Sequence, residues 1–221
     1  SMAMAMATTT MRVEVPVKRL MLMRHAKSSW KYPVSDHRRP LNSRGEKSSR
    51  AVGQFLHENA CWPSLVLSSD AKRTKETWAN MARAVGSEVA SSTRVLYLPE
   101  FYGIFDRPAT DVIMESVWRH ADGGEGETAG SRSEREEDEG AEARGGAGAV
   151  SNDVLVLGHN DGWELALNEF VGSYSGVHSM KTADLYVLEP QDGETLQSWE
   201  DIFESFGKWR IRHHVVARDL L

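Results

Sequence analysis

Short apolar runs that end in polar residues recur along the chain and predict buried β-strands. The clearest is the run at 18–26, KRLMLMRHA, which is apolar in its centre and charged at its end. Continuous apolar runs of this length suit strands that are covered on both faces. The predicted strands are 18–26, 65–69, 94–98, 153–158, 182–188, which Pro190 ends, and 209–216.

Stretches with apolar residues three and four positions apart separate these strands and predict helices. After Ser43, the residues Val52, Phe55 and Leu56 follow this spacing. Ser43 and Glu46 fit a capping box, in which Ser43 is the N-cap residue. The other predicted helices are 71–85, 106–120, with Asp106 as its cap and Pro108 in its first turn, and 164–171.

The alternation of strands and helices predicts an α/β fold. We expect a three-layer sandwich in which a mostly parallel sheet lies between helices on both faces. Ligands bind such sheets beyond the carboxyl ends of the strands. Three predicted strands end there in LMRHA, LSSD and VLGHN. We therefore expect polar side chains able to bind phosphate to gather at this edge.

The negative charge of the protein lies in one stretch of the chain. The 221 residues carry a formal charge of −6, and residues 121–150 alone hold nine acidic and three basic residues. This stretch is rich in glycine and has no aromatic residue, so it cannot bury enough apolar surface to offset its ordering entropy. The sequence thus predicts a disordered N-terminal tail at 1–17 and a single domain at 18–221, interrupted by a disordered acidic insertion at 121–150.

The remaining composition narrows the class of protein. The single cysteine, Cys61, excludes a disulfide framework and a cysteine-cluster zinc site. No apolar run reaches the roughly 18 residues of a membrane span, and outside the insertion acidic and basic residues balance. We therefore expect neither membrane nor nucleic acid as a partner, and a cytoplasmic location. Residues 2–13 weakly resemble an organellar transit peptide, but a plain tail is the simpler interpretation.

Two arginines and two histidines follow three separate strands and carry the candidate chemistry. They are Arg24 and His25, Arg73, and His159. Guanidinium groups bind phosphate oxygens through charge-assisted hydrogen bonds. A neutral imidazole can attack phosphorus, and cationic neighbours lower its pKa and keep it neutral. The alternatives are a purely structural buried polar network and a metal site. The network would require three separate strand ends to carry matching residues by chance, so it is less favoured.

These segments resemble the three motifs of the histidine phosphatase superfamily, which has the phosphoglycerate mutase-like fold. Arg24-His25-Ala26 is similar to its Arg-His-Gly signature, Ser69-x-x-x-Arg73-Thr74 to the second motif, and Gly158-His159-Asn160 to the third. Within the superfamily, RHAKSSW, DHRRPLNSRG and GHNDG resemble the SixA-type phosphohistidine phosphatase branch. The resemblance covers about residues 20–188.

The resemblance implies roles for individual residues. His25 would be the nucleophile that carries the phosphoryl group, while Arg24, Arg73 and His159 would hold its oxygens. Ser28 and Asn160 could add hydrogen bonds at the rim. The general acid is the least defined role: Glu100, in LPEFYG, is one candidate and Asp106 the other. The mechanism implies no metal, nucleotide or other cofactor.

The expected activity is therefore that of a metal-independent phosphatase. Its substrate would be a phosphorylated small molecule or a protein that carries phosphohistidine. Lys27 and Lys31 replace residues usual in the mutase branch, which weighs against a phosphoglycerate mutase-type phosphotransferase. The alternative from another class is a non-catalytic phosphate-binding or scaffold protein on the same fold. His37, Arg38 and Arg39 precede Pro40 in a loop that could face substrate, or they form a solvated turn in which Asp36 makes a local ion pair.

Overall fold

The computed structural model describes residues 17–103, 107–122, 151–173, 178–192, 194 and 196–221. In this part of the chain, six strands form one sheet in the order β3-β2-β4-β1-β5-β6. The strands are β1 Arg19–Arg24, β2 Leu65–Ser69, β3 Arg94–Leu98, β4 Asp153–Gly158, β5 Leu185–Pro190 and β6 Trp209–Val215. The helices are α1 Ser43–Glu58, α2 Lys72–Val85, α3 Ser87–Ala90, α4 Ala109–Ala121 and α5 Asn160–Phe170. Short 3₁₀ helices span Asp36–Arg38, Pro99–Phe101, Glu200–Glu204 and Ala217–Leu220.

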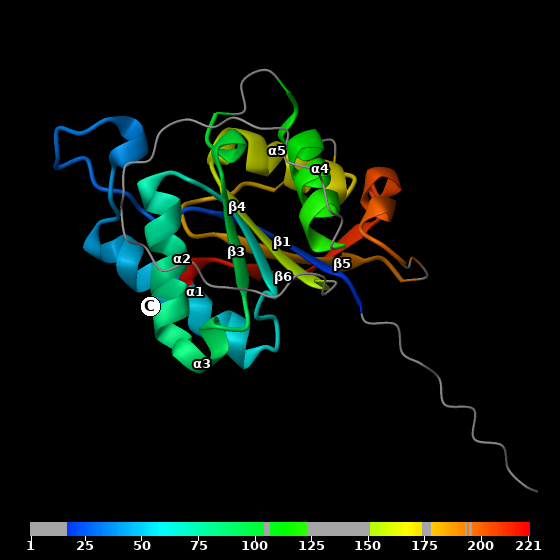
Figure 1. Ribbon diagram of the computed structural model, residues 1–221, viewed down its shortest axis with the longest axis horizontal. Helices are drawn as coiled ribbons and strands as arrows, with labels where there is room; N and C mark the ends of the chain where they lie inside the picture. Colours follow the sequence, from blue (N-terminus) through cyan, green and yellow to red (C-terminus); the bar gives the residue numbers. More distant parts are fainter. Residues whose placement is uncertain (1–16, 104–106, 123–150, 174–177, 193, 195) are drawn as a thin grey trace, which may run out of the picture.

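Two apolar clusters, one on each face of the sheet, make the three-layer sandwich. Because side chains alternate along a strand, Leu20 and Leu22 of β1 join the cluster with α4 and α5. Met21 and Met23 join the opposite cluster with α1 and α2. Figure 1 shows these two helix pairs on opposite sides of the sheet. The predicted α/β three-layer fold is confirmed.

The sheet is mostly parallel, as predicted. β1 pairs in parallel with β4, and β2 pairs in parallel with both β4 and β3. β5 runs antiparallel to both of its neighbours, β1 and β6. The parallel strands therefore bring the carboxyl ends of β1, β2 and β4 to one edge, where the candidate residues follow.

Several predicted boundaries shift by a few residues. Ser43 is not the N-cap of α1: the Asn42 carbonyl accepts the Glu46 N–H, and the Asn42 side chain accepts the Gly45 N–H at 2.9 Å. Asparagine is as good an N-cap as serine, so the helix gains one residue. β5 begins at Leu185 rather than 182, after Ala183 adopts a left-handed backbone with φ of 65°.

Helix α5 begins at Asn160, four residues before the predicted start. Gly162 lies in its first turn, where a Cβ atom would come 2.5 Å from the Cβ of Ala109. Real Cβ atoms do not approach so closely, so glycine allows α4 and α5 to pack together here. The glycine that breaks the helical pattern in the sequence is a packing requirement in the fold.

The two ends of the acidic insertion lie side by side. Ala121 is fully buried at the end of α4, and its carbonyl accepts the Ser151 N–H at 2.8 Å. Ala121 therefore belongs to the folded domain and not to the insertion. Both residues lie near the start of β4, at the edge of the sheet opposite His159. The predicted disorder at 1–17 and 121–150 otherwise concerns residues 1–16 and 123–150, which lie outside the described part of the chain.

No helix in the described residues is long and apolar enough to cross a bilayer.

Candidate active site

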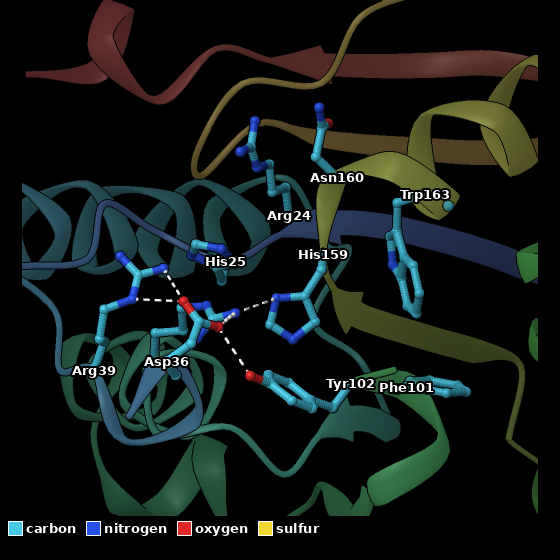
Figure 2. Close-up of a pocket in the computed structure, with 11 residues that line it drawn as sticks. Arg24, His25, Asp36, Arg39, Phe101, Tyr102, His159, Asn160 and Trp163 are labelled. Atoms are coloured by element: carbon cyan, nitrogen blue, oxygen red, sulfur yellow. Dashed lines mark hydrogen bonds and ion pairs between the residues drawn. The ribbon is translucent and has the colours of Figure 1, made fainter. Parts of the chain in front are cut away.

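A cavity of about 520 Å³ opens at the carboxyl edge of the sheet, as the strand pattern predicts. Arginine and histidine side chains supply much of its polar lining, and aromatic rings close one side. Figure 2 shows these residues. The lining residues are Arg24, His25, Asp36, Arg39, Arg73, Phe101, Tyr102, His159, Asn160, Gly162 and Trp163.

His25 is held rigidly at the end of β1. The main-chain N–H of His25 donates to the Gly158 carbonyl of β4 at 3.0 Å. The main-chain N–H of Ala26 donates to the Thr77 hydroxyl of α2, also at 3.0 Å. The Nδ1 atom of the ring lies 2.7 Å from the Ala26 carbonyl. Because a carbonyl only accepts, Nδ1 carries the proton, and Nε2 keeps its lone pair. The local backbone thus prepares Nε2 as a nucleophile.

The neutral state of His25 also follows from its surroundings. The ring is buried, and burial is the main cause that lowers its pKa to about 3. The charges of Arg73, Arg24 and Arg39 lower the pKa further, and the bond to the Ala26 carbonyl opposes them. At neutral pH the ring therefore carries no charge.

His159 lies beside His25, with ring centroids 5.2 Å apart. Its Nδ1 accepts from the Arg73 Nη2 at 3.1 Å, because a guanidinium can only donate. Its Nε2 therefore carries the proton and donates to the Ser69 hydroxyl at 3.0 Å. Burial, followed by His25 and Arg73, lowers the pKa of His159 to about 3. This second neutral ring therefore connects α2 to the end of β2, because it accepts from Arg73 and donates to Ser69.

Arg24 and Asn160 line the cavity on the side away from Asp36 (Figure 2). The Arg24 Nη1 donates to the Met180 carbonyl at 3.0 Å, which fixes the guanidinium against the segment before β5. The Asn160 Oδ1 is buried and has no hydrogen-bond partner among the described residues. The Arg24 guanidinium is therefore placed where a bound oxyanion could use it, whereas the Asn160 Oδ1 can only accept and would need a donor from a ligand.

Asp36, Arg39 and Tyr102 also line the cavity, and nothing in the sequence singled out Tyr102. The Asp36 carboxylate contacts Arg39 at 2.7 Å and Arg73 at 3.0 Å, and it accepts the Tyr102 hydroxyl at 2.9 Å. Arg39 is only 8% exposed, so it is not part of a solvated turn. The sequence signal for this cluster was the loop before Pro40, in which Asp36 can pair with a nearby basic residue.

Two of the predicted site residues do not reach the cavity. Ser28 is buried and accepts from the Arg39 Nη1 at 3.0 Å, so it supports a lining residue and does not line the cavity itself. Glu100 is exposed in the 3₁₀ helix Pro99–Phe101, while its neighbours Phe101 and Tyr102 enter the lining. The structure therefore gives no geometric support to Glu100 as the general acid. Asp106, the alternative acid, lies outside the described residues.

In the described part of the chain, no group of three or more His, Cys, Asp or Glu side chains is arranged so that it could hold a metal ion. The adjacent pair His213-His214 lies on β6, where the two rings contact different layers. His213 contacts Phe55 of α1, and His214 stacks on Tyr186 of β5. As alternation along a strand requires, the two cannot share one ligand.

Comparison with known proteins agrees with the motifs. A family model described as histidine phosphatase superfamily (branch 1) matches residues 20–202. This chain belongs to the histidine phosphatase superfamily. The superfamily's three motifs thus correspond to the three strand ends that meet at the cavity. An uncharacterized chloroplastic protein of Arabidopsis thaliana is 31% identical over 199 residues, which cover 88% of this chain and 75% of that protein.

Solved structures show the same fold. A SixA protein of Agrobacterium tumefaciens is 19% identical, with a TM-score of 0.60, and the match covers 90% of this chain and 98% of that one. The protein histidine phosphatase SixA in complex with tungstate is 15% identical, with a TM-score of 0.61, and the match covers 92% and 99% of the two chains. The predicted likeness to the SixA type of this superfamily is confirmed at the level of the fold.

Proposed function

We propose that this member of the histidine phosphatase superfamily is a phosphatase that works through a covalent phosphohistidine on His25. The observation that carries the proposal is the fixed tautomer of His25, which leaves the Nε2 lone pair in a cavity lined by three arginines. A neutral, oriented imidazole is the form that attacks phosphorus. Guanidinium groups stabilise the charge that develops on the equatorial oxygens.

The proposed reaction has two displacement steps. First, Nε2 of His25 forms a bond to phosphorus as the bond between phosphorus and the leaving oxygen or nitrogen breaks. The leaving group takes that electron pair, and its proton is either already on the leaving nitrogen or comes from water. Water then attacks the phosphorus, loses a proton and releases inorganic phosphate, and the electron pair of the broken P–N bond returns to Nε2. In this proposal Arg24 and Arg73 hold the oxygens throughout, with Asn160 at the rim. His159 joins them when its Nε2–H turns from the Ser69 hydroxyl to a phosphoryl oxygen.

The substrate class in this proposal is a phosphoramidate or phosphomonoester, including phosphohistidine on a protein. A P–N bond that is protonated on nitrogen has a good leaving group, so a general acid matters less for it than for an alkyl ester. The lining agrees with such a substrate, because Asp36 is the one carboxylate among the described lining residues and it is bound to two arginines and Tyr102. The SixA protein solved with tungstate, a tetrahedral oxyanion, supports an oxyanion site on this fold.

The proposal is tested with wild type and His25→Ala on a panel that includes phosphohistidine, phosphoramidate and small phosphoesters. Wild type should hydrolyse at least one of them and become labelled on histidine by a ³²P-labelled substrate, whereas His25→Ala should do neither. Full turnover by His25→Ala would reject the covalent mechanism.

A non-catalytic phosphate-binding protein is the second candidate. The absence of a general acid among the described lining residues favours it. Wild type would then bind orthovanadate or phosphate and hydrolyse no member of the panel. Mutase-type phosphotransfer, the weaker third possibility, would reveal itself by a requirement for a bisphosphate.

The compartment belongs to the proposal as well. The relative from Arabidopsis thaliana is named chloroplastic, which favours the organellar alternative over the cytoplasmic prediction for this chain. Fluorescent fusions with and without residues 1–17, expressed in leaf cells, separate the two. Import that depends on these residues supports the organelle, and a diffuse signal from both fusions shows that residues 1–17 do not direct import.

A further inference from the structure

Two of the three arginines that line the cavity are joined by one carboxylate. Asp36 contacts Arg39 through Oδ1, at 2.7 Å, and Arg73 through Oδ2, at 3.0 Å. The Asp36 main-chain carbonyl also accepts from the Arg73 Nη1, at 2.7 Å. One residue thus holds both terminal nitrogens of Arg73, and Figure 2 shows its carboxylate between Arg39 and Tyr102.

The segment that carries Asp36 is itself fixed on both sides. The Tyr102 hydroxyl donates to Asp36 at 2.9 Å, and the neighbouring His37 contacts Asp70 at 2.8 Å. The His37 ring also meets the Tyr102 ring edge to face, with centroids 4.7 Å apart. The carboxylate is therefore presented by a segment tied to the ends of β2 and β3.

Arg39 is fixed from two further directions. Its guanidinium carbon lies 3.6 Å from the centre of the exposed Trp30 ring, a cation–π contact. Its Nη1 donates to the Ser28 hydroxyl at 3.0 Å. With Asp36 on its edge and Trp30 on its face, this arginine is as well positioned as Arg73.

The charge of Asp36 is what allows this arrangement. Burial raises the pKa of its carboxyl, but the bond from Tyr102 and the charges of Arg73 and Arg39 outweigh burial and hold the pKa below its usual value. The group therefore stays ionised at neutral pH. Without it, two guanidinium groups at one cavity would repel each other.

We propose that Asp36 is a positioning residue that holds Arg39 and Arg73 together at the cavity and makes Arg39 a third cation for the phosphoryl oxygens. This role rests on the proposed phosphatase function. The carboxylate does not contact phosphorus or the leaving group, and it acts through the two arginines. The opposite possibility is that Asp36 competes with the substrate anion for the same donors, and the two predict changes of opposite sign.

The test compares Asp36→Asn with Asp70→Asn, a matched control that removes the charge facing His37 of the same segment and leaves the arginines alone. Orthovanadate binding is measured by calorimetry at pH 7.5, beside kcat, KM and Tm. We expect Asp36→Asn to weaken vanadate binding and to lower kcat, each by about tenfold or more, with a smaller change in KM. Asp70→Asn should stay within about twofold of wild type in both.

Unchanged vanadate binding by Asp36→Asn would overturn the positioning role, and tighter binding would overturn it and indicate competition instead. Should Asp36→Asn not fold, Tyr102→Phe removes one hydrogen bond from the carboxylate and keeps the charge. It must then weaken vanadate binding by about two- to fivefold, and unchanged binding would overturn the proposal.

The two proposals fail in different ways. A wild-type protein that binds vanadate but hydrolyses nothing overturns the phosphatase function, and the vanadate affinities still decide the role of Asp36. A wild type that hydrolyses substrate while Asp36→Asn matches it in both readouts overturns only the role of Asp36.

Discussion

The two edges of the sheet use the same residue types in opposite ways. At the amino edge of β1, Arg19 pairs with Asp153, while Glu189 contacts Arg210 and Arg212. Each of these three arginines has an acidic partner. At the carboxyl edge, Arg24, Arg39 and Arg73 line one cavity whose described lining holds one carboxylate, that of Asp36.

This contrast separates charge that stabilises the fold from charge that is available to a ligand. The paired arginines of the amino edge connect β1, β4, β5 and β6, so their electrostatic partners lie within the fold. The carboxyl edge keeps an excess of positive charge, and its two histidines are held neutral. Such an imbalance is what a site for a dianion requires. The four experiments below test the contrast, from the largest expected effect to the smallest.

Removal of a cavity arginine should give the largest effect. We expect Arg73→Gln to lower kcat/KM by on the order of 10²–10³, because it removes charge that meets the transition state. Arg212→Gln, at the other edge, should stay within about twofold of wild type, because its charge never reaches substrate. Steady-state kinetics on the best substrate of the panel measures both. Equal losses in the two variants would contradict the division of roles between the edges.

Acid should destabilise the fold through the cavity histidines. Their pKa is lowered from 6.5 to about 3 on folding, so their contribution to stability is complete above pH 6.5 and declines as the pH falls from 6.5 toward 3. Together His25 and His159 should cost about 3 kcal/mol between pH 6.5 and 5. Urea unfolding of wild type and of a His25→Asn/His159→Asn variant measures this. Parallel pH dependences for the two proteins would refute the assignment.

Disruption of the amino edge should affect stability and leave catalysis alone. Arg19 and Asp153 are each 20% exposed, so Asp153→Asn leaves a mostly buried guanidinium without its charged partner. We expect a loss of about 2 kcal/mol in the free energy of unfolding. The kcat of the folded protein should match wild type. A fall in kcat with unchanged stability would show that the two edges are coupled.

Relief of backbone strain behind the nucleophile should give the smallest effect. Ala183 has a φ of 65°, and its N–H lies within hydrogen-bond distance of the carbonyls of Arg24 and His25. Ala183→Gly removes the Cβ penalty of this conformation, and the flexibility of glycine offsets part of the gain. We expect a rise in Tm of about 1–2 °C with unchanged kcat. A lower Tm would mean that the Ala183 methyl group contributes more by packing than it costs in strain.

The strand-end residues of the site could be predicted from the sequence because period and topology determine where they lie. Arg24 and His25 follow an apolar run directly, His159 follows another, and parallel pairing brings these ends together. Arg73 lies in the first turn of α2, directly after a third such run.

The rest of the site lies in loop segments that have no regular pattern of apolar residues, so their course cannot be predicted from the sequence. Asp36 lies in a three-residue 3₁₀ helix, and Arg39 is the residue just after it. In the turn after β3, three consecutive residues differ completely: Glu100 is exposed, Phe101 is buried and Tyr102 reaches Asp36. A shift of two residues in such a turn exchanges a candidate acid for a phenol, which is why Glu100 was among the weakest of the predicted residues.

The hydrogen bond between Ala121 and Ser151 makes the chain divisible at that point. Loop length between two adjacent ends changes the closure entropy only slowly, so segments of very different size can connect α4 to β4 at similar stability. Fragments that end at Ala121 and begin at Ser151 would each keep their own part of the carboxyl edge, the first with His25 and Arg73 and the second with His159. Hydrolysis of a phosphorylated substrate by the mixed fragments would then measure whether they reassemble.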